Sequence, residues 1–169
     1  SVGVPFLVVA TQNPVEQAGT YRLPEAQLDR FLMKTSLGYP DHAATMRILE
    51  NSAEGRREVS PIITPEALVT LSSIAREVFL NPLVLDYIGR IVDATRNAAQ
   101  VRLGVSVRGA LALTRAAKVW ALAHGRAYVT PDDVKALAEP VLAHRLILDA
   151  EAEFDGVTCL LYTSPSPRD

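Results

Sequence analysis

The sequence has 169 residues, of which 49% are hydrophobic and 6% aromatic, and its formal net charge is −2. This composition suffices for one full domain or two small ones and favours helices that pack through small residues. It implies no basic face, which disfavours nucleic acid as the main ligand but leaves a local basic patch open. The single cysteine, Cys159, excludes an internal disulfide framework, and the apolar runs stay below the roughly 18 residues that a membrane span needs.

The first 40 residues contain two short apolar runs that indicate strands. Phe6 to Ala10 is rich in valine and ends in a turn, which is typical of a strand buried on both faces of a parallel sheet. A second candidate runs from Phe31 to Leu37, after a stretch in which Pro24, at a first helical position, and Glu25 favour one or two helical turns.

The chain does not begin with methionine, no signal peptide precedes residue 6, and a strand begins almost at once. We therefore expect a piece of a longer protein.

Beyond residue 40 the pattern is helical, and each expected helix begins at a capping residue. The expected helices run from Asp41 to about Ala53, from Thr64 to about Phe79, from Asn81 to past Thr95, from Ser106 to Gly125 and from Thr130 to about Leu148. Apolar residues recur at helical spacing in the second and third of these, at Leu68, Leu71, Ile74, Ala75 and Val78, and at Val84, Leu85, Ile88, Ile91, Val92 and Thr95. The last four helices predict a compact bundle.

Asn13 is the first candidate for a site residue. The sequence T-Q-N-P at 11–14 can be read simply as a turn, because Asn and Pro are common turn formers. The alternative is a site, because ligands of open α/β sheets bind at the carboxyl ends of the strands. A neutral amide there could hold a water molecule against a phosphate without adding charge.

Two arginines are the next candidates. Arg30 is either a surface residue paired with Asp29 or Glu25, or part of a site. Arg108 lies in the first turn of an expected helix, where the helix dipole favours negative charge, and no acid lies nearby in sequence. This position suggests that Arg108 binds an anion from outside. Arg115, seven residues further on the same face, either extends that patch or is solvated.

Several segments together resemble the MoxR family of AAA+ ATPases. They are F-L-V-V-A-T-Q-N-P (6–14), G-T-Y (19–21), L-P-E-A-Q-L-D-R-F (23–31), G-Y-P (38–40), S-V-R (106–108) and Y-V-T-P-D-D-V-K (128–135). The resemblance covers roughly residues 4–157. It implies an α/β fragment, namely the last strands of a P-loop AAA+ parallel sheet, followed by an all-α four-helix lid bundle. The implied parts are the C-terminal end of the AAA+ core at 1–40, the helical lid domain at 41–155 and an unrelated or disordered tail at 156–169.

The resemblance also assigns roles to the candidates. Asn13 corresponds to the first sensor, which orients the attacking water against the γ-phosphate of ATP. Arg30 corresponds to the arginine finger, which reaches the nucleotide site of a neighbouring subunit and neutralises charge during phosphoryl transfer. Arg108 corresponds to the second sensor, which couples the angle of the lid to the presence of the γ-phosphate.

The family further implies ATP with Mg²⁺ as cofactors, a cytoplasmic homo-hexamer, and chaperone-like maturation or remodelling of client proteins. A protein with a von Willebrand factor A domain is the implied partner, and neither nucleic acid nor a membrane span is expected.

The sequence departs from the family pattern in two places. It has no G-x-x-x-x-G-K-[ST] loop and no apolar strand ending in Asp-Glu, so the Mg²⁺ ligands are not in this chain. L-I-L-D-A-E at 146–151 is a weak imitation of that strand, and we reject it because it follows the lid and falls at the end of an expected helix. We therefore expect ATP hydrolysis by the parent protein and none by these 169 residues alone.

Other sites and functions have less support. The Ser-Pro-rich end after Gly156 indicates an unrelated scar, or alternatively a natural proline-rich recognition tail, and we assign no function to Cys159. His42, His124 and His144 lack metal-ligand spacing, and no nucleophile elbow is present. Two alternative functions are a helical protein-interaction module without a nucleotide role and a helix-turn-helix-like DNA binder. The apolar body of the segment from Val107 to His124 argues against the DNA binder.

Overall fold

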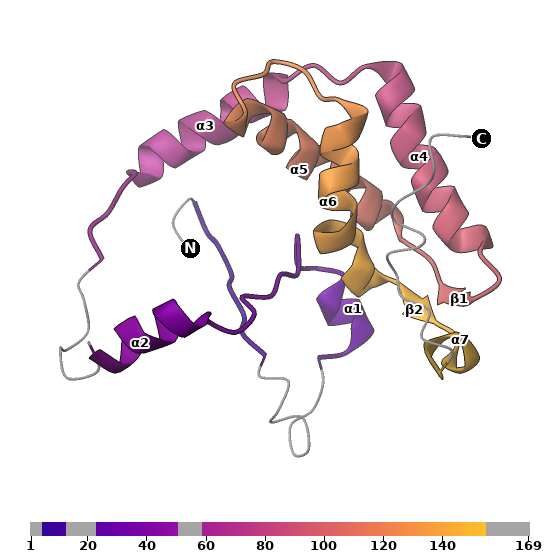
Figure 1. Ribbon diagram of the computed structural model, residues 1–169. Coiled ribbons are helices and arrows are strands. Elements are labelled where there is room, and N and C mark those ends of the chain that lie inside the picture. Colours follow the sequence, from indigo (N-terminus) through magenta and orange to yellow (C-terminus); the bar gives the residue numbers. More distant parts are fainter. Residues whose placement is uncertain (1–4, 13–22, 51–58, 155–169) are drawn as a thin grey trace.

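The computed structural model describes residues 5–12, 23–50 and 59–154. Asn13, the G-T-Y segment at 19–21 and Cys159 lie outside these residues. In Figure 1, helices α3 to α6 form a bundle, α1 lies beside the C-terminal end of α6, and α2 lies apart from the bundle. The predicted four-helix bundle is therefore present in the structure.

The helices follow one another in the order that the sequence predicts, and two short strands, a 3-10 turn and a last short helix are added. The helices are α1 (Glu25–Leu28), α2 (His42–Glu50), α3 (Pro65–Glu77), α4 (Pro82–Asn97), α5 (Val107–Ala123), α6 (Pro131–Leu142) and α7 (Ala150–Phe154), with a 3-10 turn η3 (Ala143–Arg145); the strands are β1 (Val101–Leu103) and β2 (Ile147–Leu148).

Local capping chemistry sets the helix starts. Thr64 Oγ1 accepts a hydrogen bond from the N–H of Ala67 at 3.2 Å, and the side chain of Asn81 accepts one from the N–H of Leu83 at 2.9 Å. Ser106, Thr130 and Asp41 cap α5, α6 and α2 in the same way. These bonds satisfy backbone N–H groups that a helix leaves without a partner in its first turn. The predicted N-caps are confirmed, and Pro24 lies at the N-cap of α1, one residue earlier than predicted.

The core lies between α4, α5 and α6. Ile88 and Ile91 of α4 pack with Leu113 of α5, and full burial of such a side chain contributes about 1.5–3 kcal/mol. Ala117 and Ala121 are completely buried on α5, so small residues let neighbouring helices approach closely, as the composition predicts. The predicted stripe of α3 is only partly used, since Ala75 and Val78 are buried while Leu68, Leu71 and Ile74 stay exposed.

The last predicted helix is too long. Helix α6 ends at Leu142 rather than near Leu148, and the chain continues as η3 and β2. Strand β2 pairs antiparallel with β1, with Val101 opposite Leu148 and Leu103 opposite Ile147. This pairing joins segments that are distant in sequence, so helical periodicity alone could not predict it. Consequently, L-I-L-D at 146–149 contains a two-residue strand and is not a helix end, although it still follows the last helix of the bundle.

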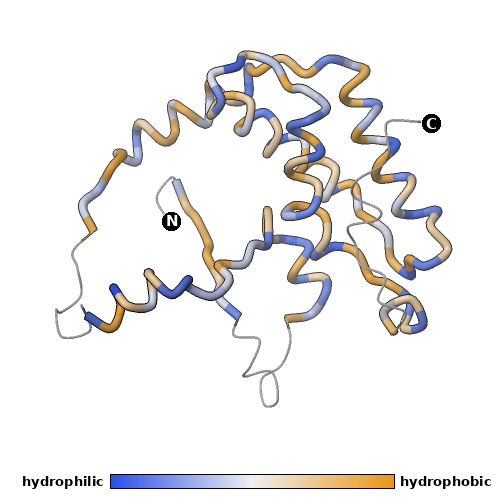
Figure 2. Tube along the Cα trace, viewed as in Figure 1, coloured by the Kyte–Doolittle hydropathy of each residue, from blue (hydrophilic) through white to orange (hydrophobic). Residues whose placement is uncertain are grey.

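The two apolar runs near the N-terminus form no strand in the part of the chain that the structure describes. Phe6 to Val9 is extended and exposed, and Figure 2 shows a hydrophobic stretch along it. A buried strand needs neighbouring strands for its N–H and C=O groups, and the described residues provide none. In the second run, from Phe31 to Leu37, Lys34 instead donates its N–H to the carbonyl of Pro140 in α6 at 2.8 Å.

Candidate functional site

Arg30 lies directly after α1 and is exposed. Within the described residues its side chain makes no ion pair and no hydrogen bond, so the alternative of a surface pair with Asp29 or Glu25 is not observed. Its guanidinium is therefore available to an external anion, in keeping with the chemistry expected of a finger. Its backbone N–H is bonded to the carbonyl of Gln27 at 3.1 Å, which continues the last turn of α1.

Arg108 has an acidic partner that the sequence did not predict. Its Nη1 atom lies 3.8 Å from Oδ2 of Asp29, which belongs to the end of α1. The first-turn position of Arg108 is therefore no evidence by itself for an anion from outside. The pair is long and Arg108 is 59% exposed, so the interaction contributes little and can be exchanged for a stronger anion. Arg115 remains exposed on the same helix.

Asp29 joins α1 to the start of α5. The hydroxyl of Ser106 lies 3.1 Å and 3.2 Å from the two carboxylate oxygens of Asp29, and it also accepts the N–H of Gly109 at 3.3 Å. Ser106 thus caps α5 and binds Asp29 with one hydroxyl. The residue before Arg30 and the first turn that carries Arg108 are consequently held together.

Arg145 completes this cluster and was missed by the sequence analysis. Its side chain is only 2% exposed, and its Nε donates to Oδ1 of Asp29 at 3.0 Å. Burial lowers the pKa of Arg145, while the charge and the hydrogen bond of Asp29 oppose that shift. The signal in the sequence was an arginine at an apolar position, since Arg145 continues the buried stripe of Leu137, Ala138 and Val141.

Gly109 makes room for Arg145. A Cβ atom at Gly109 would lie 2.9 Å from Cδ of Arg145 and 2.5 Å from Cγ1 of Val105. A side chain at this position of α5 would therefore collide with the arginine that binds Asp29. The glycine in S-V-R-G is thus explained by packing against the cluster.

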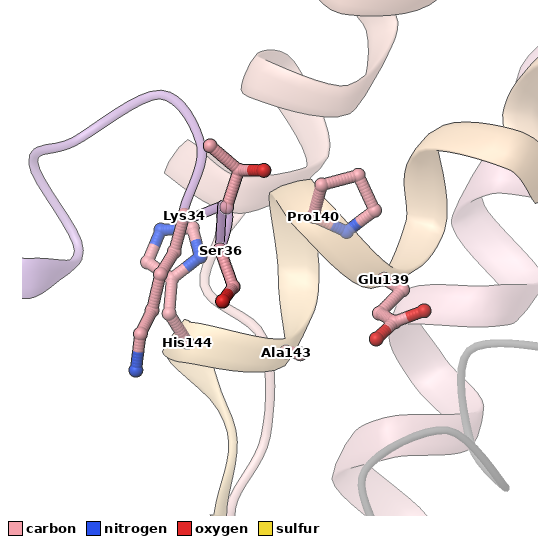
Figure 3. Close-up of a pocket in the computed structure, with 7 residues that line it drawn as sticks. Lys34, Ser36, Glu139, Pro140, Ala143 and His144 are labelled. Carbon is pink, nitrogen blue, oxygen red and sulfur yellow. The ribbon is translucent and has the colours of Figure 1, made fainter. Parts of the chain in front are cut away.

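His144 lies beside the cluster. Its Nε2 atom is 2.7 Å from Nη1 of Arg145, and its Nδ1 atom is buried without a partner among the described residues. Burial and the positive charge of Arg145 lower the pKa of His144, so the neutral ring is favoured. The carbonyl of Phe31, 3.3 Å from the same Nε2 atom, opposes this shift. His144 also lines a pocket with Lys34 and Glu139, shown in Figure 3.

A second arginine–carboxylate pair stabilises the bundle away from this cluster. Arg126 donates to both carboxylate oxygens of Asp133, at 2.7 Å and 2.5 Å. Asp133 is buried and also accepts the N–H and hydroxyl of Thr130 in a capping box. The hydrogen bonds from Arg126 lower the pKa of Asp133 to about 2, against the opposing effect of burial.

Residues 5–12, 23–50 and 59–154 bring no three His, Cys, Asp or Glu side chains close enough together to hold a metal ion. Among the helices described, none has the length and apolar character that a bilayer crossing requires.

Family models match both parts of the chain. Residues 1–33 match the model described as "ATPase family associated with various cellular activities (AAA)", and residues 93–159 match the AAA lid domain. A crystal structure of a proposed ATPase from Cytophaga hutchinsonii superposes with a TM-score of 0.85 at 36% identity, covering 96% of this chain and 52% of that one. The class of protein is therefore an AAA+ ATPase with a helical lid.

Curated relatives make the family more specific. The chain is 44% identical to the uncharacterized protein YeaC of Bacillus subtilis (90% of this chain, 48% of the relative) and 39% identical to the chaperone MoxR1 of Mycobacterium tuberculosis (91% and 43%). It is 31% identical to the protein MoxR of Paracoccus denitrificans (86% and 49%). The chain belongs to the MoxR family of AAA+ ATPases, and it spans about half the length of the curated relatives it matches.

Proposed function

We propose that the protein carrying this chain couples ATP hydrolysis to chaperone-like maturation or remodelling of protein clients. The observation that carries the proposal is that Asp29 joins the segment of Arg30 to the first turn of Arg108. Asp29, the residue before the exposed Arg30, thereby contacts the exposed Arg108 of α5. A relative named as a chaperone, MoxR1, supports the choice of client remodelling.

Each candidate has a distinct task in this proposal. Asn13 orients the water that attacks the γ-phosphate, although it lies outside the described residues. Arg30, exposed and unpaired within them, stabilises charge on the phosphate oxygens of a neighbouring subunit. Arg108 exchanges its weak pair with Asp29 for the γ-phosphate of its own or an adjacent subunit. This exchange removes one contact between the lid and the end of α1.

The remaining parts of the proposal come from the family. Residues 1–40 end the AAA+ core, and 41–155 form the lid. Residues 156–169 are an unrelated or disordered tail, of which 156–159 still fall inside the match to the lid model. The working unit is a cytoplasmic homo-hexamer with a von Willebrand factor A domain protein as partner. ATP and Mg²⁺ bind mainly to groups outside this chain, and Mg²⁺ supplies charge neutralisation at the phosphates. The 169 residues alone do not hydrolyse ATP.

The test compares Arg30→Ala and Arg108→Ala in a complete protein that carries this sequence together with a phosphate-binding loop. We expect Arg30→Ala to reduce turnover by roughly 10³-fold or more while ATP binding persists. Arg102→Ala is the matched control, because Arg102 also lies 3.8 Å from an acid of α1, Glu25, and is similarly exposed. Unchanged turnover in Arg30→Ala would contradict the finger assignment.

One observation favours a second candidate, a helical protein-interaction module without a nucleotide role. Leu68, Leu71 and Ile74 of α3 and Ile48 and Leu49 of α2 are exposed apolar residues. If this candidate is correct, replacing Leu68, Leu71 and Ile74 of α3 by uncharged polar residues abolishes partner binding. Arg30→Ala and Arg108→Ala then have no effect on the protein's activity. The same two arginine variants therefore distinguish the candidates.

A further inference from the structure

The guanidinium of Arg145 binds the backbone on both sides of Arg30. Its Nη2 atom donates to the carbonyl of Asp29 at 3.2 Å and to the carbonyl of Phe31 at 2.5 Å. Its Nη1 atom donates to the carbonyl of Leu32 at 3.3 Å. One buried side chain of η3 therefore bonds to the residue before Arg30 and to the two residues after it.

Arg145 is itself fixed to the helical bundle. Its Nη1 atom also donates to the carbonyl of Val141, in the last turn of α6, and contacts Nε2 of His144. Gly109 of α5 leaves the space that its stem occupies. A planar guanidinium with five N–H donors can serve acceptors in several directions, whereas a lysine ammonium cannot reproduce that fork. Figure 1 shows the resulting arrangement, with α1 lying next to the chain that leaves α6.

The bonds from Arg145 matter for Arg30 because Arg30 is held by its backbone alone. Its side chain has no partner within the described residues, so only its backbone determines where the guanidinium starts. The local bonds of that backbone, from the N–H of Arg30 to Gln27 and from the N–H of Phe31 to Leu28, belong to a helix of a single turn. An isolated turn is not stable by itself, so the position of Arg30 depends on tertiary bonds to its neighbours. Four of these bonds come from Arg145, and the others come from Ser106 and His144.

We infer that Arg145 is a positioning residue for Arg30, through which the orientation of the lid sets the position of the finger. The inference rests on the proposed function, because it assumes that Arg30 acts on a phosphate. Movement of α5 and α6 then carries Arg30 with it, since Asp29, Phe31 and Leu32 are bonded to the lid. A nucleotide that binds Arg108 on α5 thereby influences the finger on the same subunit.

The first test uses turnover in the complete protein. Arg145→Met removes every bond of the guanidinium, and Arg145→Lys keeps the charge without the fork. We expect both to lower kcat by roughly 10- to 100-fold, as for a misplaced catalytic group, with KM for ATP nearly unchanged. Arg126→Met is the matched control: it removes a bidentate arginine of the same bundle that does not contact 29–32. Equal losses of kcat in Arg145→Met and Arg126→Met would show a merely structural role and overturn the inference.

The second test separates the inference from the proposed function. A spin label is placed at position 30 of the same protein in an Arg30→Cys, Cys159→Ser background, and its mobility is compared with and without Arg145→Met. We expect a more mobile label in Arg145→Met and no change in Arg126→Met. An unchanged label would overturn the inference even where Arg30→Ala abolishes turnover. Unchanged turnover in Arg30→Ala together with a mobilised label would refute the finger and leave the anchoring intact.

A combined variant gives the last criterion. If Arg145 acts through Arg30, Arg145→Met lowers the residual turnover of Arg30→Lys far less than it lowers that of the unmodified protein. Fully additive losses would mean that Arg145 acts elsewhere, and the inference would be wrong.

Discussion

The buried guanidinium of Arg145 and the carboxylate of Asp29 lie 3.0 Å apart and join the end of α1 to the chain that follows α6. The side chain of Arg145 is almost completely buried, and that of Asp29 is 25% exposed. Because a buried charge without a counter-charge is costly, this pair is a condition for docking α1 on the lid. The weaker contact between Asp29 and Arg108 depends on the same carboxylate.

Removing the charge of Asp29 tests that condition. We expect Asp29→Asn to lower the free energy of unfolding of the 169-residue chain by about 2–3 kcal/mol, because Arg145 keeps its carbonyl acceptors but loses its counter-charge. Urea unfolding gives the value. Asp93→Asn is the control, since Asp93 forms an exposed pair with Arg96 that is worth at most about 0.5 kcal/mol. Similar small changes in both variants would contradict the importance of the buried pair.

Much of the helical fold could be predicted because its signals are local. Thr64, Asn81, Ser106 and Thr130 cap helices through side-chain bonds to residues two or three positions away, and such signals are present in the sequence itself. The pairing of β1 with β2 could not be predicted in this way, since it depends on which distant segments meet.

The site was predicted less completely for the same reason. The finger and sensor roles of Arg30 and Arg108 come from the resemblance and remain predictions. Their shared neighbour Asp29 and the anchor Arg145 emerge only when α1 is placed against η3. The apolar run from Phe6 to Ala10 predicted a strand that the described residues do not form. A strand forms only where partner strands are present, and the run itself carries no information about them.

Acid should weaken the bundle through Asp133. Its pKa in the folded state is about 2, below the ordinary value of 3.8, so the folded protein binds fewer protons than the unfolded chain in this interval. The resulting stability is present above about pH 4 and is lost as the pH falls towards 2. Asp133→Asn should therefore be less stable at neutral pH and approach the unmodified chain near pH 2. An NMR titration of Asp133 with a midpoint near its ordinary value would refute this account.

His144 should produce a separate pH effect at a higher pH. Burial and the charge of Arg145 lower the pKa of His144 below 6.5, so the unfolded chain binds the proton more readily than the folded one. Stability contributed by the neutral ring is present above about pH 6.5 and decreases as the pH falls below that value. We expect His144→Gln to flatten the dependence of the free energy of unfolding on pH between about 7 and 5. If the free energy of unfolding depends on pH equally in both proteins, a group other than His144 causes the dependence.

Two glycines in helices should respond to alanine in opposite directions. At Gly109 of α5, the added Cβ would meet Val105 and Arg145 at 2.5 Å and 2.9 Å, so Gly109→Ala should cost about 1–3 kcal/mol despite the better helix propensity of alanine. At Gly89 of α4, nothing lies within 4 Å of the new Cβ, so Gly89→Ala should add about 0.5–1 kcal/mol to the free energy of unfolding. Urea unfolding of both variants provides the comparison. Because the two substitutions change the same atoms within helices, their difference measures the contact with Val105 and Arg145, and a stabilised Gly109→Ala would show that Arg145 does not need the space that this glycine leaves.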